Sequence, residues 1–359
     1  MPDVGARAIA FYLPQFHPVP ENDDWWGPGF TEWRNVAKAR PLFRGHAQPH
    51  LPGDLGFYDL RLPEVREAQS DLARAHGVEA FAYWHYWFGD GRTILDRPFR
   101  EVLASGEPGI GFCLAWANET WSGRWHGLDQ RVLMEQRYPG PEDDQAHFDA
   151  VLPALTDPRY LRVGDRPVYY VLRPENLPDP AAFVDRWQAM ARAAGLPPLY
   201  LVAEVSHWFD WGHGFTEVES AGFDTGVDMY LPARFDRRDF WRRRVLRRIG
   251  HGPERYTFDP RLLGGAPLAR SMQPVVYPTW DNTPRSGRRG FVLTGTSPAG
   301  FADQVAQAVA TLADRPAAER LLWVKSWNEW AEGNYLEPDV EHGDAWLRAL
   351  ASGLGLRQG

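Results

Sequence analysis

Two glutamates near the end of this 359-residue sequence have the type and spacing of an acid/base pair. Glu329 and Glu332 stand three positions apart, and Trp327, Trp330 and Tyr335 flank them. Sugar transfer or hydrolysis needs a group that protonates the leaving oxygen and a second carboxylate that assists the attack. In a turn, residues at this spacing share one face, and nearby aromatic rings that exclude water raise the pKa of a carboxyl. We expect this pair to be catalytic; two solvated loop glutamates are the alternative.

Two further glutamates are candidates for contact with a substrate. Glu119 follows Asn118 directly after an apolar run, where an Asn-Glu pair either hydrogen-bonds sugar hydroxyls or transfers a proton. We favour substrate contact for both residues, with support of the loop as the alternative. Glu32 precedes Trp33, and it either reaches the site or caps a short helix.

Aromatic residues beside polar ones are frequent, since the chain has 17 Trp, 13 Tyr and 19 Phe. Pyranose rings stack on such aromatic faces while their hydroxyls bind neighbouring polar groups. The expected substrate contacts share this setting: Tyr12, Gln15, His17, Glu32, Trp33, His85, Trp87, Trp116, Asn118, Glu119, Trp121, Trp280, Asp281, Asn282, Trp327, Asn328 and Tyr335. For Asp281 and Asn282, a plain turn is nearly as good an explanation. The histidines lack metal-ligand spacing, so we expect neither a metal nor another cofactor.

The elements that must position these residues are short apolar runs separated by helical patterns. Eight such runs occur: Ala8–Leu13, Ala80–Tyr83, Gly111–Trp116, Val168–Leu172, Leu199–Val205, Val227–Leu231, Val275–Tyr277 and Leu322–Ser326. Amphipathic patterns predict helices at Pro63–His76, Asp143–Leu155, Ala181–Ala194 and Pro298–Ala313. Strands alternating with helices indicate a parallel sheet, and eight strands in this length favour a single (β/α)₈ TIM-type barrel domain over residues 1–359.

The polar-aromatic clusters follow six of these runs, which places them at one face of the predicted barrel. Barrel enzymes hold their active sites at the carboxyl ends of the strands. The gap between the sixth and seventh runs has no clear pattern apart from the arginine-rich segment Arg234–Arg248. This segment is either a solvated surface helix or a cover that meets an anionic partner.

Composition excludes several classes of function. A net charge of −8 gives no basic footprint for nucleic acid, and no apolar run approaches the roughly 20 residues that span a bilayer. Met1 to Ala8 lacks the apolar stretch of a signal peptide, so a cytoplasmic location is expected. The lone cysteine, Cys113, is expected to be a buried apolar residue. The expected partner is an oligosaccharide or polysaccharide substrate.

Long segments of the chain resemble the WbsX-type, glycoside hydrolase family 99-like proteins of bacterial polysaccharide loci. They occur in one order along nearly the whole sequence: Ala10–Pro18, Trp25–Trp33, Trp84–Phe88, Cys113–Glu119, Trp280–Arg285, Ser326–Gly333 and Leu336–Pro338. One departure is Ala331, at a place usually held by histidine in the family 99 endo-α-mannosidases.

The resemblance implies a metal-independent, retaining (β/α)₈-barrel hydrolase that works through a 1,2-anhydro sugar. Carried over, Glu329 takes the proton from the 2-hydroxyl of the substrate, and Glu332 protonates the leaving oxygen. The implied substrates are α-linked, manno-configured bacterial glycans that contain mannose or rhamnose. The alternatives are a glycosyltransferase or transglycosylase of polysaccharide biosynthesis, and a sugar-binding barrel without catalysis.

Overall fold

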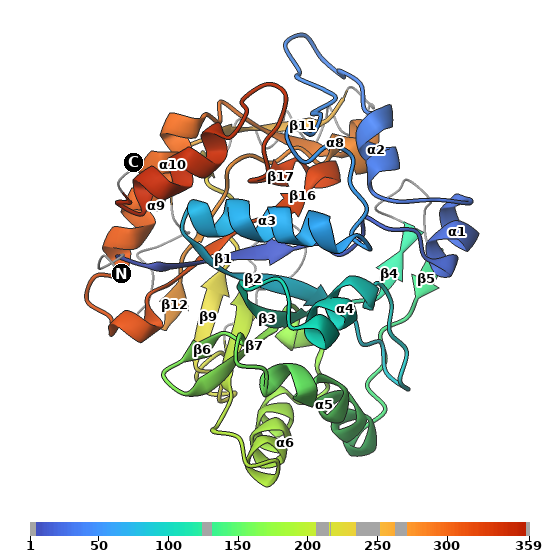
Figure 1. The fold of residues 1–359 in the computed structure, drawn as a ribbon, viewed down its shortest axis with the longest axis vertical. Helices are drawn as coiled ribbons and strands as arrows, with labels where there is room; N and C mark the ends of the chain where they lie inside the picture. Colours follow the sequence, from blue (N-terminus) through green and yellow to red (C-terminus); the bar gives the residue numbers. More distant parts are fainter. Residues whose placement is uncertain are drawn as a thin grey trace.

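A ring of parallel strands surrounded by helices forms the centre of the molecule (Figure 1). The computed structural model describes residues 5–123, 131–205, 215, 217–234, 252–262 and 271–356. The parallel strands are β1 (Arg7–Tyr12), β2 (Val78–His85), β3 (Gly111–Trp116), β7 (Arg166–Val171), β8 (Tyr200–Val205), β9 (Thr225–Asp228), β12 (Met272–Gln273), β13 (Val275–Val276) and β15 (Leu321–Val324). The short strand β6 (Arg162–Val163) pairs antiparallel with β7.

The ring closes through one run of residues that is interrupted at Pro274. Strand β12 pairs with β9, and strand β13 pairs with β15, so this run joins the two ends of the sheet. Proline has no N–H to donate to a ladder, but the Pro274 carbonyl still accepts from the Trp323 N–H at 3.1 Å. With β12 and β13 counted as one strand the ring has eight, which confirms the predicted (β/α)₈-type barrel.

Each of the eight predicted strand runs coincides with a strand of the ring. The sixth is displaced, because β9 begins at Thr225 and ends at Asp228, whereas the prediction covered Val227–Leu231. Aromatic side chains fill the interior of the barrel. Phe11 stacks on Trp84 with 4.7 Å between ring centroids and meets the edge of Tyr170 at 5.2 Å. Strands buried on both faces explain why the runs are continuously apolar.

The helices that cover the barrel include all four predicted ones, each within two residues at both ends. They are α3 (Pro63–Ala75), α4 (Arg97–Ser105), α5 (Pro141–Leu155), α6 (Pro180–Ala193), α9 (Pro298–Thr311) and α10 (Ala345–Gly353). A proline occupies the start of α3, α5, α6 and α9, where its missing N–H costs nothing. The Asp179 carboxylate caps α6 by accepting from the Ala182 N–H at 2.9 Å.

Short elements lie beyond the carboxyl ends of the strands and build the mouth of the barrel (Figure 1). Their helices are α1 (Pro20–Trp26), α2 (Trp33–Lys38), α8 (Thr283–Ser286), η2 (Pro174–Asn176), η3 (Gly287–Arg289) and η5 (Trp330–Glu332); η4 (Ala317–Glu319) precedes β15. Their strands pair as β4 (Trp121–Ser122) with β5 (Val132–Met134), β16 (Asn328–Glu329) with β17 (Asn334–Tyr335), and β11 (Glu254–Phe258) with β10 (Ala233–Arg234) and β14 (Phe291–Thr294). Residues 235–251, which hold most of the arginine-rich segment, lie outside the described residues.

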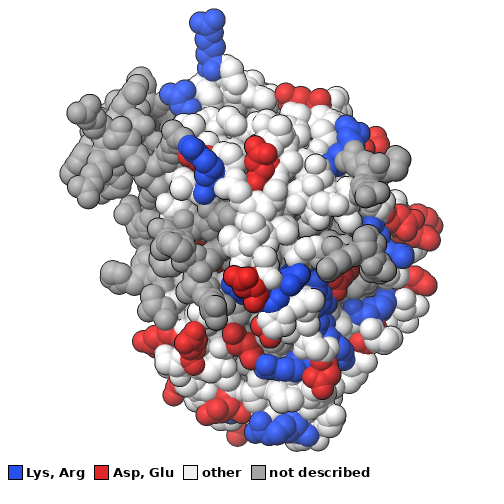
Figure 2. Space-filling view, turned by 90° about the vertical axis from the view of Figure 1, so that its left-hand side faces the viewer, with Lys and Arg blue, Asp and Glu red and all other residues white. Residues whose placement is uncertain are grey.

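The visible outer surface carries charges of both signs. In Figure 2, acidic and basic side chains intermix over the described part of that face. None of the helices in the described ranges has the length and apolarity needed to cross a membrane.

Candidate active site

The two glutamates lie on a tight turn that follows strand β15. Glu329 ends β16 and pairs with Asn334 of β17, while Glu332 ends the single helical turn η5. Gly333 then takes a left-handed φ of 60°, and a Cβ there would lie 2.7 Å from the Asp281 carbonyl oxygen. Only glycine fits this position, so the turn brings both carboxyl groups to the mouth of the barrel in a defined geometry.

Glu329 is buried, with 4% of its surface exposed, and three donor groups surround its carboxylate. The Trp84 indole N–H donates to Oε1 at 3.0 Å, and Lys325 Nζ lies 3.5 Å from the same oxygen. A guanidinium nitrogen of Arg285 lies 3.7 Å from Oε2. Burial alone would raise the pKa of Glu329, but Lys325 and Arg285 outweigh it and lower that pKa. The carboxylate is therefore held in its ionised form.

Glu332 has the opposite electrostatic setting. Arg285 donates to its Oε1 at 2.6 Å, and the Asn334 side-chain amide lies 3.5 Å from Oε2. Burial and the negative charge of Glu329 raise the pKa of Glu332 by more than Arg285 and Lys325 lower it. Two carboxyl groups whose pKa values move apart are suited to act as a base and an acid.

Arg285 connects three carboxylates at the mouth of the barrel. Besides Glu332 and Glu329, it donates from Nε to Glu32 Oε2 at 3.0 Å. Glu32 is fully buried at the start of α2, where Arg285 is its ion-pair partner. Burial would lower the pKa of Arg285, yet the surrounding carboxylates raise it above its usual value.

Asp281 and Asn282 hold the turn that carries Arg285. The Asp281 carboxylate accepts from the Thr283 N–H at 3.0 Å and hydroxyl at 2.6 Å, and from the Gln48 amide at 2.6 Å; His46 Nε2 lies 2.7 Å away. Asn282 Oδ1 accepts from the Phe291 N–H at 2.8 Å. These side chains are engaged by the protein, an arrangement that favours positioning of α8 over direct contact with a sugar.

Lys325 and Glu204 complete the charged groups of the mouth, and the sequence-based list lacked both. Lys325 Nζ lies 5.1 Å from the ring centroid of Trp84 and 5.7 Å from that of Trp280, which are cation–π distances. Glu204, near the end of β8, is 4% exposed and accepts from the Tyr170 hydroxyl at 2.7 Å. Burial raises the pKa of Glu204 to about 7. Glu204 begins one of the six polar-aromatic clusters, whereas Lys325 stands alone as a charged residue near the end of an apolar run.

Asn118 and Glu119 lie beside these groups, on the loop after β3. Asn118 is fully buried and pins Arg173 by donating to its carbonyl and accepting from its N–H, both at 2.7 Å. The Glu119 carboxylate is partly exposed, and its Oε2 lies 3.5 Å from Arg173 Nε. Glu119 therefore remains accessible, whereas Asn118 is committed to the loop.

His85, Trp87 and Trp116 gather around the buried His147 of α5. Trp87 stacks on the His147 ring at 4.8 Å, and His85 Nε2 lies 2.8 Å from His147 Nε2. The Trp116 indole N–H donates to the Trp87 carbonyl at 2.9 Å. These contacts indicate that Trp87 and Trp116 pack behind the mouth of the barrel and do not line it. His85 is half-buried.

Another group of predicted residues belongs to a buried polar network under the glutamate turn. Tyr12 donates to Gln69 at 2.7 Å, and Gln69 donates to Glu337 at 2.6 Å. Asn328 exchanges two hydrogen bonds with the Leu13 backbone at 2.7 and 3.0 Å. Burial raises the pKa of Glu337 to about 7.

The remaining predicted residues are spread around the same end of the barrel. Trp33 donates to the Tyr58 carbonyl at 2.7 Å, and Tyr335 stacks on Trp330 at 3.9 Å. The others are buried, except for the half-buried Trp121: Gln15, His17, Trp121, Trp280 and Trp327. The side chains that contact Glu329 and Glu332 are thus fewer than predicted, and they include Arg285 and Lys325.

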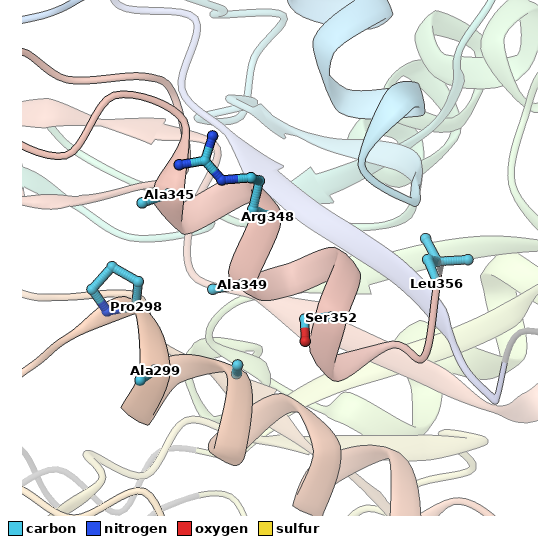
Figure 3. A pocket seen from close by; sticks show the side chains of 8 residues that line it. Pro298, Ala299, Ala345, Arg348, Ala349, Ser352 and Leu356 are labelled. Atoms are coloured by element: carbon cyan, nitrogen blue, oxygen red, sulfur yellow. The ribbon is translucent and has the colours of Figure 1, made fainter. Parts of the chain in front are cut away.

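A metal centre and a surface groove are the two other candidate sites. In the described ranges, no cluster of three or more His, Cys, Asp or Glu has a geometry that could hold a metal ion. A surface groove between α9 and α10 is lined mainly by small apolar side chains, with Arg348 at its edge (Figure 3). Arg348 forms an ion pair with Asp344, so the groove offers no free acid or base among its described lining residues.

Solved structures show where this fold occurs. A protein described as glycoside hydrolase-like has a TM-score of 0.61 and 13% identity, and the match covers 97% of this chain and 94% of that one. Two structures of the family 99 endo-α-mannosidase from Bacteroides thetaiotaomicron have TM-scores of 0.57 and 0.55 at 16% and 14% identity. These matches cover 97% and 99% of this chain, and 96% and 97% of theirs. At these identities, the likeness shows the fold alone.

Sequence comparison shows the family. Proteins described as "Uncharacterized protein WxcX" from two strains of Xanthomonas campestris pv. campestris are 40% and 41% identical to this chain over 97% of its length. The chain spans about half the length of these relatives, 50% in each case. The model of the family described as glycosyltransferase WbsX matches residues 8–350. The chain therefore belongs to the WbsX glycosyltransferase family, on a barrel fold shared with family 99 endo-α-mannosidases.

Proposed function

We propose that this chain is a retaining glycoside hydrolase that cleaves α-linked, manno-configured bacterial glycans through a 1,2-anhydro sugar. One observation carries the proposal: the buried carboxyl group of Glu329 and the partly buried one of Glu332 share one turn and are both contacted by Arg285. The pKa of Glu329 is lowered by its cationic neighbours, and that of Glu332 is raised by burial and by Glu329. Glu329 is the base and Glu332 is the acid.

In the first step, ionised Glu329 removes the proton from the substrate's 2-hydroxyl, and O2 attacks C1. The bond between C1 and the leaving oxygen breaks, and the proton of Glu332 moves to that oxygen. In the second step, Glu332 takes a proton from water as the water oxygen attacks C1. The C1–O2 bond opens, and Glu329 returns its proton to O2. Two inversions at C1 give retention, and both glutamates regain their starting states.

The arrangement suits this chemistry because neither carboxylate must bond to the sugar. When Glu329 gains a proton, the negative charge that raises the pKa of Glu332 disappears, so Glu332 gives up its proton more readily. Arg285 contacts both groups and stabilises whichever one is charged. The total charge of the pair stays constant while the proton enters at one residue and leaves from the other.

The substrate class follows from stereochemistry. Formation of an anhydro ring requires O1 and O2 to be trans, as in α-mannosides and α-rhamnosides. The fold shared with endo-α-mannosidases supports this class. Ala331 stands where those enzymes usually have histidine, so rhamnose-containing glycans belong in the substrate screen beside mannose-containing ones.

Glutamine variants test the roles of the two glutamates. We expect Glu329→Gln and Glu332→Gln each to lower turnover of an unactivated glycan by about 10²-fold or more, the scale for removing a positioned acid or base. With an activated leaving group, Glu332→Gln should recover much of its activity, whereas Glu329→Gln should not. A substrate methylated or deoxygenated at C2 should be inert. A fluorosugar adduct on Glu329 would disprove the anhydro route and support a double displacement instead.

A glycosyltransferase or transglycosylase of polysaccharide biosynthesis is the second candidate, because the family description supports it. Such an enzyme would pass the sugar to an acceptor hydroxyl in place of water. A screen of defined bacterial glycans, run with and without nucleotide sugars and followed by product analysis, separates the two. Chain extension that requires a nucleotide sugar would reject hydrolysis as the main activity.

A further inference from the structure

The floor of the barrel mouth carries a carboxyl group and an ammonium group that the proposed acid/base chemistry does not use directly. Glu204 comes from the end of β8, and Lys325 directly follows β15. In the ring, β9 and the β12–β13 run separate these two strands. Both groups lie close to the same aromatic rings, because the Tyr170 ring, whose hydroxyl donates to Glu204, and the Lys325 ammonium lie 5.2 Å and 5.8 Å from the Phe11 ring centroid.

The Glu204 carboxyl has hydrogen-bonding capacity to spare. Among the described residues, its hydrogen-bond partner is the Tyr170 hydroxyl, which donates to Oε2 at 2.7 Å. A carboxyl group has two oxygens and about four acceptor positions, so one donor leaves most of them available. Besides Tyr170, the titratable groups that act on it are Arg173, Lys325, Glu119 and Tyr277.

Lys325 links this floor to the proposed general base. Its ammonium group has three protons to donate, and Glu329 Oε1 lies 3.5 Å away. The same glutamate oxygen accepts from Trp84, whose ring lies under the ammonium at 5.1 Å. A sugar whose C2 faces Glu329 would therefore place its next hydroxyls near Lys325 and the floor.

We propose that Glu204 and Lys325 form a hydroxyl-binding subsite for the same sugar ring whose C1 and C2 face Glu332 and Glu329. This inference rests on the proposed function, and it names neutral pyranoses with free hydroxyls at C3 or C4 as the ligands. A buried acceptor and a buried donor that face the same aromatic rings can each bind a hydroxyl of one sugar ring, and leaving such groups unpaired is costly. The subsite rejects sugars that lack those hydroxyls.

Ligand-observed NMR in the Glu332→Gln background tests the subsite without turnover. The probes are methyl α-D-mannopyranoside, its 3-deoxy and 4-deoxy analogues, and methyl α-L-rhamnopyranoside. We expect Glu204→Gln to weaken binding of a fully hydroxylated probe by about 10-fold, the scale of one hydrogen bond to a charged group. One deoxy analogue should bind the parent and the Glu204→Gln protein equally, because it has already lost the contact.

Glu337→Gln is the matched control, because burial raises the pKa of Glu337 to the same value of about 7 but its partners lie in the network under the turn. This variant should keep the parent's preference among the probes. Should Glu204→Gln fail to fold, Tyr170→Phe removes the hydroxyl that orients Glu204 and should lower the preference between hydroxylated and deoxy probes in the same direction.

Two results would overturn the subsite: a preference among the probes that Glu204→Gln leaves unchanged, whether or not all of them bind more weakly, or no binding of any probe by the parent. The proposed function can be disproved without disproving the subsite. If Glu204→Gln abolishes the discrimination between probes but the wild-type protein hydrolyses no glycan, the subsite stands and the hydrolase assignment falls.

Discussion

Arg285 is the side chain on which the charge balance of the candidate site depends. It contacts Glu32, Glu329 and Glu332, all three within a buried region. Without it, three carboxylates would repel one another in a setting of low dielectric, where removing one partner of a buried ion pair costs about 3–5 kcal/mol. The arginine thus stabilises the turn and also sets the protonation of the acid/base pair.

An Arg285→Gln variant should therefore lose activity and change its pH dependence. Arg285 lowers the pKa of Glu329, so its removal should raise that pKa. Because the base must be ionised, the acidic limb of kcat/KM should move to higher pH, with a loss on the order of 10²-fold at neutral pH. Arg348→Gln, on the outer helix α10, is the control and should leave the profile unchanged. An acidic limb that does not move in Arg285→Gln would show that Glu329 is not the titrating base.

Sequence reasoning found the two glutamates, but not that Arg285 and Lys325 would contact them and tune their pKa values. The spacing of Glu329 and Glu332 is local, so the sequence displays it. Lys325, Arg285 and Glu204 come together only when β8, α8 and the turn after β15 are folded. Trp116 shows the reverse case: its motif looks like a sugar platform, yet the ring is 2% exposed because the sequence does not tell which way a strand-end side chain points.

At the scale of elements, a buried carboxyl joins three segments under the active-site turn. Glu337 is fully buried and accepts from Tyr58 at 2.8 Å, from Gln69 of α3 at 2.6 Å, and from Trp330 of η5 at 2.6 Å. The network ties the loop after β1 and helix α3 to the turn that carries Glu332. This network has an energetic cost, because burial opposes ionisation of the Glu337 carboxyl group.

Glu337→Gln should make stability less dependent on pH. Burial raises the pKa of Glu337 from 4.5 to about 7, so between these values the folded protein keeps a proton that the unfolded chain releases. Stability therefore falls as pH rises through this window. The melting temperature of the variant, relative to wild type, should increase between pH 5 and pH 8. Glu204 contributes a slope of the same sign, which the double variant would remove. If the melting temperatures of wild type and Glu337→Gln change by the same amount between pH 5 and pH 8, the raised pKa of Glu337 is contradicted.

The long elements were predictable, and the short ones were not. Continuous apolar runs identified all eight strands, and the starts of helices were marked by prolines such as Pro63 and Pro298. Strands β16 and β17 have two residues each, too few for any periodicity. Strand β9 was displaced because Gly226, which lies against the Met272 sulfur, interrupts its apolar pattern.

At the scale of the whole molecule, one barrel contains every described element of the catalytic proposal. We predict that residues 1–359 unfold as a single cooperative unit, since the β12–β13 run joins the two ends of the ring. Scanning calorimetry should give equal calorimetric and van't Hoff enthalpies. Two resolved transitions would instead require a division into domains.

Activity should also survive exhaustive chelation. The proposed steps use carboxyl groups alone, and within the described ranges no cluster of ligands for a metal is present. The measurement is turnover of the screened glycan before and after treatment with a chelator. Loss of turnover, followed by recovery with one divalent ion, would refute the metal-independent mechanism.

Pairing of β1 with β15 has a consequence for synthesis on the ribosome. Arg7 pairs with Leu321, so one edge of the first strand lacks its partner until residue 321 has been made. At about 5–20 residues per second, this interval lasts roughly 15 to 60 seconds. During that time an apolar strand edge is open to pairing with other nascent chains. Nascent chains halted before residue 321 should therefore be held by chaperones, and release should follow completion of β15.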